Sequence, residues 1–229
     1  MIPLEHLATA QVPGGAELRL MRRGADFMIV LDRNELMNSR MSGSEEALAV
    51  MTAERLAGRK KPNFLIGGYG MGFTLRAALE VLGPDAVITV AEIVPEIMEW
   101  ARGPMAALTG TCLEDPRVDL IEADVAHLIG REQGLYDAIL LDVDNGPDGL
   151  VRSGNFRLYT REGLAAAKAA LTPGGVLAVW SAAPDPVFAG RLKKAGFAVD
   201  EVVVRARSNG KGARHVIWFA VKPDGRDAD

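Results

Sequence analysis

The alternation of short apolar runs with segments of helical periodicity constrains the fold of this chain more than any other feature. Five runs rich in Val, Ile and Leu follow one another along the chain, at residues 63–67, 86–92, 117–124, 136–142 and 176–181. Amphipathic segments separate these runs, a pattern typical of a parallel sheet that helices cover on both faces. Two more strands, at 199–207 and 214–222, flank a turn and are expected to pair antiparallel. The sequence therefore predicts an α/β fold with a doubly wound, mostly parallel, seven-stranded sheet.

The N-terminal segment lacks this alternation. Residues 1–15 are expected to form a loose lead-in, and short strands at 16–23 and 26–32 form a plausible hairpin. We therefore expect two parts, an N-terminal β-hairpin and helix over residues 1–60 and a larger domain over residues 61–229.

The helix of the N-terminal part has a recognisable beginning and end. Ser42 or Ser44 is expected to be its N-cap, because a serine hydroxyl can accept a hydrogen bond from a free backbone N–H of the first turn. Glu45 and Glu46 place acidic side chains in that turn, and Gly58 is expected to end the helix.

The composition excludes several classes of protein. In a chain of 229 residues, a hydrophobic content of 48% excludes intrinsic disorder, and a single cysteine, Cys112, excludes a disulfide framework. The N-terminus lacks the basic and apolar regions of a signal peptide, and no apolar run approaches the roughly 20 residues of a membrane span. We therefore expect a cytoplasmic protein that does not interact with membranes.

Glycines follow the first apolar run, where a parallel sheet places its ligand. The spacing is Gly68-x-Gly70-x-Gly72, which allows a tight turn and close approach of a ligand to the backbone. A dinucleotide-binding fingerprint requires glycine or alanine where this chain has Phe73, so the NAD interpretation is weakened. The loop alone leaves both a nucleotide site and a plain tight turn open.

Carboxylates follow three consecutive runs. Glu92, Asp124 and Asp142 end the second, third and fourth runs, so the parallel strands bring them to one edge of the sheet. Glu92 lies 20 residues beyond Gly72, where an acidic side chain can accept hydrogen bonds from ribose hydroxyls. Three carboxylates beside a glycine loop favour a nucleoside site over solvated surface acids.

Several motifs in order resemble the spermidine synthase-like family. GYGMGFTLR at 68–76 is similar to its glycine loop GGGDGGTLR, and AEIVPE at 91–96 resembles VEIDPE. DPRV at 115–118 and YDAILLD at 136–142 resemble DPRV and YDVIIVD, and LTPGGV at 171–176 resembles LKPGGVL. The similarity extends over roughly residues 60–180. It implies the Rossmann-like fold of class I S-adenosylmethionine-dependent methyltransferases, of which the polyamine aminopropyltransferases are one branch.

The resemblance also implies roles for individual residues. It places Gly68, Gly70 and Gly72 against the tail of a nucleoside such as S-adenosylmethionine or decarboxylated S-adenosylmethionine. It assigns the ribose to Glu92, the adenine amino group to Asp124 and the edge of the adenine ring to Val125. Asp142 takes the place of the family's catalytic aspartate.

Four positions depart from the family pattern. Met71 stands where the family has the aspartate that meets the donor's tail amine, and Leu36 stands where it has a glutamine. Glu45-Glu46 falls at the family's Tyr-His pair, and Asn145 at its second loop aspartate. We therefore expect methyl transfer from S-adenosylmethionine to a small molecule. The alternatives are aminopropyl transfer from the decarboxylated donor to a diamine, and a non-catalytic nucleoside-binding or oligomeric regulatory protein.

Transfer from a sulfonium donor requires an aligned acceptor with a free lone pair, and an amine acceptor must lose a proton. Asp142 is the first candidate base and Asp144 the second, although either could instead cap the turn at 145–147. We expect a small-molecule acceptor, with an amine and a homodimer both compatible with the sequence.

The remaining residues with reactive side chains indicate no further chemistry. His6, His127 and His215 lack metal-ligand spacing, so no metal site is predicted. Trp180 and Trp218 are expected in the core.

The charge is divided unevenly along the chain. Residues 1–150 carry 13 basic and 23 acidic side chains, whereas residues 151–229 carry 13 and 7. Such an asymmetry can indicate a nucleic-acid face. The basic residues near the last turn, however, lack the interleaved aromatics that stack on bases. We therefore interpret the split as an acidic site edge, which suits a cationic ligand, and an ordinary basic surface, with no nucleic-acid partner.

Overall fold

Two sheets form the framework of the computed structural model, which describes residues 2–143, 147 and 153–225. The larger sheet has the strand order β10-β11-β9-β8-β5-β6-β7. Its strands are β5 (Asn63–Gly67), β6 (Val87–Glu92), β7 (Val118–Glu122), β8 (Tyr136–Leu141), β9 (Leu171–Ser181), β10 (Ala198–Arg205) and β11 (Arg214–Val221). Strands β5 to β9 are parallel to one another, and β11 pairs antiparallel with β9 and β10. The predicted fold class, with seven strands, is confirmed.

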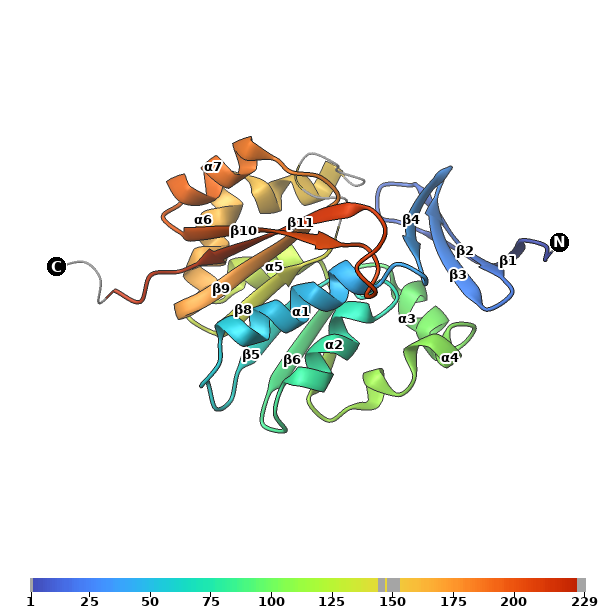
Figure 1. Ribbon diagram of the computed structural model, residues 1–229, viewed down its shortest axis with the longest axis horizontal. Coiled ribbons are helices and arrows are strands. Elements are labelled where there is room, and N and C mark those ends of the chain that lie inside the picture. Colours follow the sequence, from blue (N-terminus) through green and yellow to red (C-terminus); the bar gives the residue numbers. More distant parts are fainter. Residues whose placement is uncertain (1, 144–146, 148–152, 226–229) are drawn as a thin grey trace.

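Helices cover both faces of this sheet (Figure 1). They are α1 (Gly43–Arg55), α2 (Phe73–Val81), α3 (Pro95–Arg102), α4 (Ala106–Thr109), α5 (Val125–Arg131), α6 (Arg161–Ala170) and α7 (Pro186–Lys194), with short 3₁₀ turns η1 (Cys112–Glu114) and η2 (Ser153–Tyr159). Strand β5 shows why both faces need cover, because its side chains alternate between two cores. Phe64 and Ile66 pack in the core that includes α1 and α2, and Leu65 packs in the core of α5 and α6.

The smaller sheet is more extensive than the predicted hairpin. It is an antiparallel meander of four strands, β1 (Glu5–Gln11), β2 (Glu17–Arg23), β3 (Asp26–Leu31) and β4 (Asn34–Asn38). The expectation of a loose lead-in is wrong for β1, and β4 was not predicted. Both are edge strands with mostly exposed or half-buried side chains, so they lack the alternation by which the apolar face of β2 and β3 is recognised.

Helix α1 begins at Gly43, with Ser42 as its N-cap residue, but the Ser42 side chain makes no capping hydrogen bond. Ser44 lies inside the first turn, where its hydroxyl bonds to other side chains. The helix ends at Arg55, before Gly58, which has a φ of +97° in the turn that follows.

Nowhere in the part of the chain that the structure describes is there a helix long and apolar enough to span a membrane. The cytoplasmic location and the division at residue 60 stay predictions.

Candidate functional site

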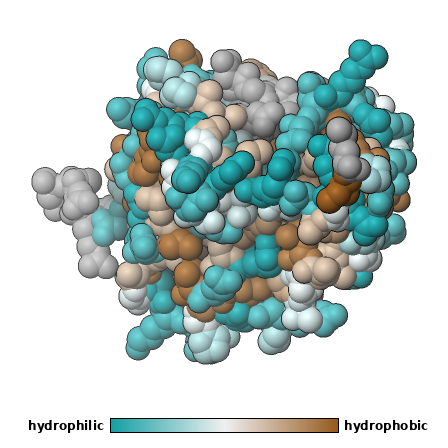
Figure 2. Space-filling view, turned by 45° about the vertical axis from the view of Figure 1, so that its right-hand side comes forward, coloured by the Kyte–Doolittle hydropathy of each residue, from teal (hydrophilic) through white to brown (hydrophobic). Residues whose placement is uncertain are grey.

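A cavity of about 270 Å³ opens at the carboxyl ends of β5, β6 and β8, under the smaller sheet. Strand β5 lies between β8 and β6, so the chain order reverses here, which is where open α/β sheets bind their ligands. The smaller sheet contributes a largely apolar wall, which includes Leu18, Ile29, Leu31, Leu36 and Met37. The larger domain contributes the acids Glu92, Asp124 and Asp142, and α1 contributes Glu45. Outside the cavity, hydrophilic and apolar side chains are interspersed on the side of the molecule shown in Figure 2.

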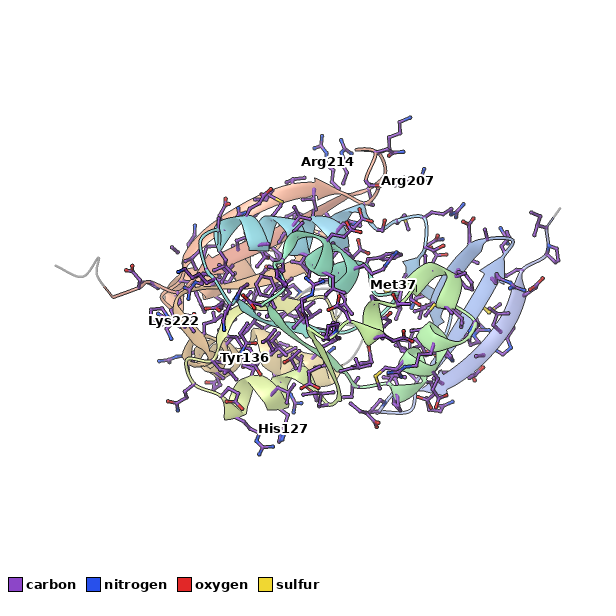
Figure 3. All side chains as sticks on the ribbon, turned by 90° about the horizontal axis from the view of Figure 1, so that it is seen from below. Met37, His127, Tyr136, Arg207, Arg214 and Lys222 are labelled. Carbon is purple, nitrogen blue, oxygen red and sulfur yellow. The ribbon has the colours of Figure 1, made fainter. Side chains whose placement is uncertain are left out.

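The glycine loop between β5 and α2 is packed too closely for larger residues. A Cβ atom on Gly68, at a φ of +83°, would lie 2.7 Å from the carbonyl oxygen of Asp142. A Cβ atom on Gly70, at +54°, would lie 2.5 Å from the Met37 sulfur, which reaches between the two sheets (Figure 3). Gly68 and Gly70 line the cavity, whereas Gly72 lies at the start of α2, next to the Tyr69 ring.

Glu92 is almost fully buried, with 4% of its surface exposed, and its carboxylate holds two loops together. One oxygen accepts from the backbone N–H of Tyr69 at 2.9 Å, and the other from Ile93 and Val94 at 2.8 and 2.9 Å. Burial raises the pKa of Glu92, and the backbone donors oppose this rise. The backbone N–H of Gly70 also stabilises this carboxylate, so backbone donors take up most of its roughly four acceptor positions.

Asp124 also has partners within the protein. Its Oδ1 accepts from the backbone N–H of Ala126 at 2.9 Å and so caps α5, and its Oδ2 lies 2.5 Å from Arg157 Nη2. Asp124 and Val125 both line the cavity, as the family pattern implies. An adenine amino group would therefore share the Asp124 carboxylate with the exposed Arg157.

Asp142 and Glu45 form a second acidic group at the end of β8. Thr74 donates to Asp142 Oδ2 at 3.0 Å, and its hydroxyl lies 3.5 Å from the carbonyl oxygen of Glu45. Burial raises the pKa of Asp142 to about 6. Burial and, next, repulsion from Asp142 raise the pKa of Glu45 to about 8. At neutral pH this pair therefore holds about one proton, and Asp142 is the member that can accept one.

The position of Glu45 in the cavity was not predicted from the sequence. Glu45-Glu46 marks the loss of a family motif, but Glu45 lines the cavity together with Asp142. Asn155 and Trp180 also line the cavity, and Trp180 packs in the core as expected. The indole N–H of Trp180 is buried and has no hydrogen-bond partner among the described residues. Asp144, the second candidate base, and Asn145 lie outside the described residues.

No family model matches the chain, but it has relatives among known proteins. It is 32% identical over 128 residues to polyamine aminopropyltransferase 2 of Pseudomonas aeruginosa, a match that covers 54% of this chain and 34% of the relative. It is 29% identical over 171 residues to a polyamine aminopropyltransferase of Mycobacterium tuberculosis, over 73% of this chain and 31% of the relative. The matched part of the chain thus spans about a third of the length of these relatives.

The fold has solved counterparts. The crystal structure of spermidine synthase from Thermotoga maritima superposes with a TM-score of 0.73 at 19% identity, and the match covers 95% of this chain and 72% of that one. This match confirms the Rossmann-like fold, and the sequence relatives confirm the resemblance to the spermidine synthase-like family.

The expectation of methyl transfer is wrong. The relatives are named as aminopropyltransferases, and the structural neighbour is a spermidine synthase. The expectation depended on Met71, whose side chain is fully buried in the core and is absent from the cavity lining. A residue that does not face the cavity cannot select between the tails of two donors.

Proposed function

We propose that the chain transfers an aminopropyl group from decarboxylated S-adenosylmethionine to a small amine. The observation that carries this proposal is the Asp142–Glu45 pair beside the glycine loop, because an amine acceptor needs a carboxylate to take its proton. The names of the sequence relatives, polyamine aminopropyltransferases, support transfer of an aminopropyl group and an amine acceptor.

The reaction requires little covalent chemistry from the protein. The lone pair of the acceptor nitrogen forms a bond to the aminopropyl carbon that is attached to sulfur. The C–S bond breaks, and its electron pair stays on sulfur, which leaves as a neutral thioether. One proton is lost from the acceptor nitrogen, and Asp142, with a pKa of about 6, takes it. Alignment of nitrogen, carbon and sulfur in the cavity supplies the rest of the rate enhancement.

The cavity lining fits such a donor. The tight backbone at Gly68 and Gly70 lets a ligand tail approach the main chain, and Glu92 lines the cavity at a strand end, where a carboxylate suits a ribose hydroxyl. Ile93 and Ile97 offer an apolar surface to a flat base. The four carboxyl groups of the lining favour a positively charged sulfonium over a phosphate-bearing dinucleotide.

A ligand panel tests the donor. Decarboxylated S-adenosylmethionine at 100 times its Kd should raise the free energy of unfolding by about 2.7 kcal/mol, and S-adenosylmethionine should raise it less. NAD should give no shift, and a shift with NAD alone would contradict the nucleoside assignment.

Turnover tests the reaction. The decarboxylated donor with a panel of monoamines and diamines should yield the thioether and an aminopropylated amine, both measured by mass spectrometry. Binding of the donor without turnover of any amine would instead support a non-catalytic nucleoside-binding protein.

A further inference from the structure

A chain of hydrogen bonds leads out of the cavity from Glu45. The Ser44 hydroxyl lies 2.6 Å from Glu45 Oε2 and 2.8 Å from His215 Nδ1, although Ser44 and His215 are 171 positions apart in the sequence. Ser44 is fully buried and Glu45 is 8% exposed, whereas His215 is half-buried at the start of β11. The chain therefore runs from the cavity lining toward the surface.

The packing holds His215 in place. Its ring meets the edge of the Trp180 ring, with centroids 4.8 Å apart, and Trp180 lies on the neighbouring strand β9 and lines the cavity. The backbone also joins the two segments, because the N–H of Gly43 donates to the carbonyl of Ala206 at 3.0 Å. A Cβ atom on Gly43 would lie 2.3 Å from the backbone nitrogen of Ser208, so α1 begins directly against the turn that precedes β11.

Charged groups surround this chain on three sides. Helix α1 contributes Glu45 and Glu46, and Asp142 follows β8. The β10–β11 hairpin contributes Arg205 and Arg214, which are paired in register next to His215. Arg214 and Arg207 lie at the same end of the hairpin in Figure 3.

We propose that Glu45, Ser44 and His215 form a proton relay that carries the proton of the acceptor amine from the cavity toward solvent. The inference rests on the proposed amine transfer, because that reaction releases one proton in the cavity in each turnover. It assigns His215 and Ser44 as positioning residues of the reaction, although neither lines the cavity.

The relay conserves protons at every step. Asp142 passes the proton that it took from the amine to one carboxyl oxygen of the neighbouring Glu45. The Ser44 hydroxyl, which donates to Glu45 Oε2 in the structure, turns toward His215, and Glu45 gives a proton from Oε2 to the Ser44 oxygen. The Ser44 hydroxyl hydrogen moves to Nδ1 of neutral His215, and the resulting imidazolium releases its Nε2 proton to water. The same three groups then return to their first state when each bond reverses its direction.

Both end groups of the relay are uncharged at neutral pH. Glu45, with a pKa of about 8, carries a proton at neutral pH and can give it up when another arrives. Burial lowers the pKa of His215, so the imidazole stays neutral as an acceptor and does not retain the proton.

Removal of the middle hydroxyl tests the relay with little risk to the fold, since Ser44→Ala introduces a good helix former into α1. We expect kcat with an amine acceptor to fall about tenfold, less than the 10²–10⁴-fold of a direct proton acceptor. KM for both substrates should stay unchanged, and the pH dependence of kcat should shift. His215→Gln should give the same result, and added imidazole should partly restore His215→Ala.

The matched control is His127→Gln, because His127 is exposed on α5, far from the hairpin that carries Arg214 in Figure 3. This variant should leave kcat and its pH profile as in the wild type. Unchanged pH profiles in Ser44→Ala and His215→Gln would overturn the relay while the proposed function stands. If the wild-type protein transfers no aminopropyl group to any amine, the proposed function itself fails, and the relay with it.

NMR provides a readout that does not depend on turnover. The ring nitrogens of His215 should report a titration near pH 8 that belongs to Glu45. This step should disappear in both Glu45→Gln and Ser44→Ala, whereas its persistence in Ser44→Ala would contradict a connection through the hydroxyl.

Discussion

Glu92 and Asp142 lie at the ends of the two strands that flank β5, yet the protein holds their carboxylates in different ways. Glu92 accepts three backbone N–H groups from two loops, whereas Asp142 accepts the hydroxyl of Thr74 and lies near a second carboxyl group, Glu45. Backbone donors are fixed and always present their hydrogens, so Glu92 is bound into the structure as an acceptor. A hydroxyl group can turn, and so Asp142 and Glu45 can gain or lose protons without disturbing the backbone.

Glu92 is therefore a structural carboxylate, whereas Asp142 and Glu45 form a reactive pair at the same edge of the sheet. Glu92 and Asp142 both lie beside the cavity because each stands at the end of a strand of the same sheet. Their partners decide which of them can take part in proton transfer.

The largest expected effect is on turnover and comes from a change in the Asp142–Glu45 pair. Asp142→Asn should lower kcat about 10²–10⁴-fold, because the amide cannot take the proton of the amine. The Kd of the donor, measured by calorimetry, should change much less. Asp119→Asn, an exposed position on β7, is the control and should not affect kcat. Unaffected turnover in Asp142→Asn would remove Asp142 as the base.

The second largest effect is on stability and comes from a change at Glu92. Glu92→Gln should lower the free energy of unfolding by about 1–3 kcal/mol, because its NH₂ group cannot accept from a buried backbone N–H. Chemical denaturation measures this change. Glu122→Gln is a matched control, because Glu122 is the exposed partner of Glu92 on β7 and should change stability by less than about 0.5 kcal/mol. Equal losses in the two variants would show that the three backbone bonds do not matter.

The smallest effect is on the pH dependence of stability. The pKa of Glu45 is raised by folding from 4.5 to about 8, so the folded state binds more protons than the unfolded state in this range. The contribution of Glu45 is therefore fully present below pH 4.5 and is lost as the pH rises to about 8. Glu45→Gln should make the decline of unfolding free energy with pH shallower in denaturation experiments across this range. Glu54→Gln, exposed on the same helix, should keep the wild-type slope, and a wild-type slope in Glu45→Gln would contradict the raised pKa.

The sequence by itself determined the parallel sheet, its glycine loop and the acids at its edge. Strands such as β5 and β8 are buried on both faces, so their runs of consecutive apolar residues are visible in the order of residues. The loop at Gly68 and the acids Glu92 and Asp142 follow strand ends directly, so a local pattern was sufficient to bring them together.

Only the tertiary structure decided the partners of those acids. Nothing local joins Ser44 to His215 or Arg157 to Asp124, and the edge strands β1 and β4 are held by backbone pairing that leaves little trace in their side chains. Sequence patterns record which face of a helix or strand is apolar, because that periodicity repeats over neighbouring residues. Hydrogen bonds between distant segments depend on how the elements pack, and packing determined which carboxylate is fixed and which can exchange a proton.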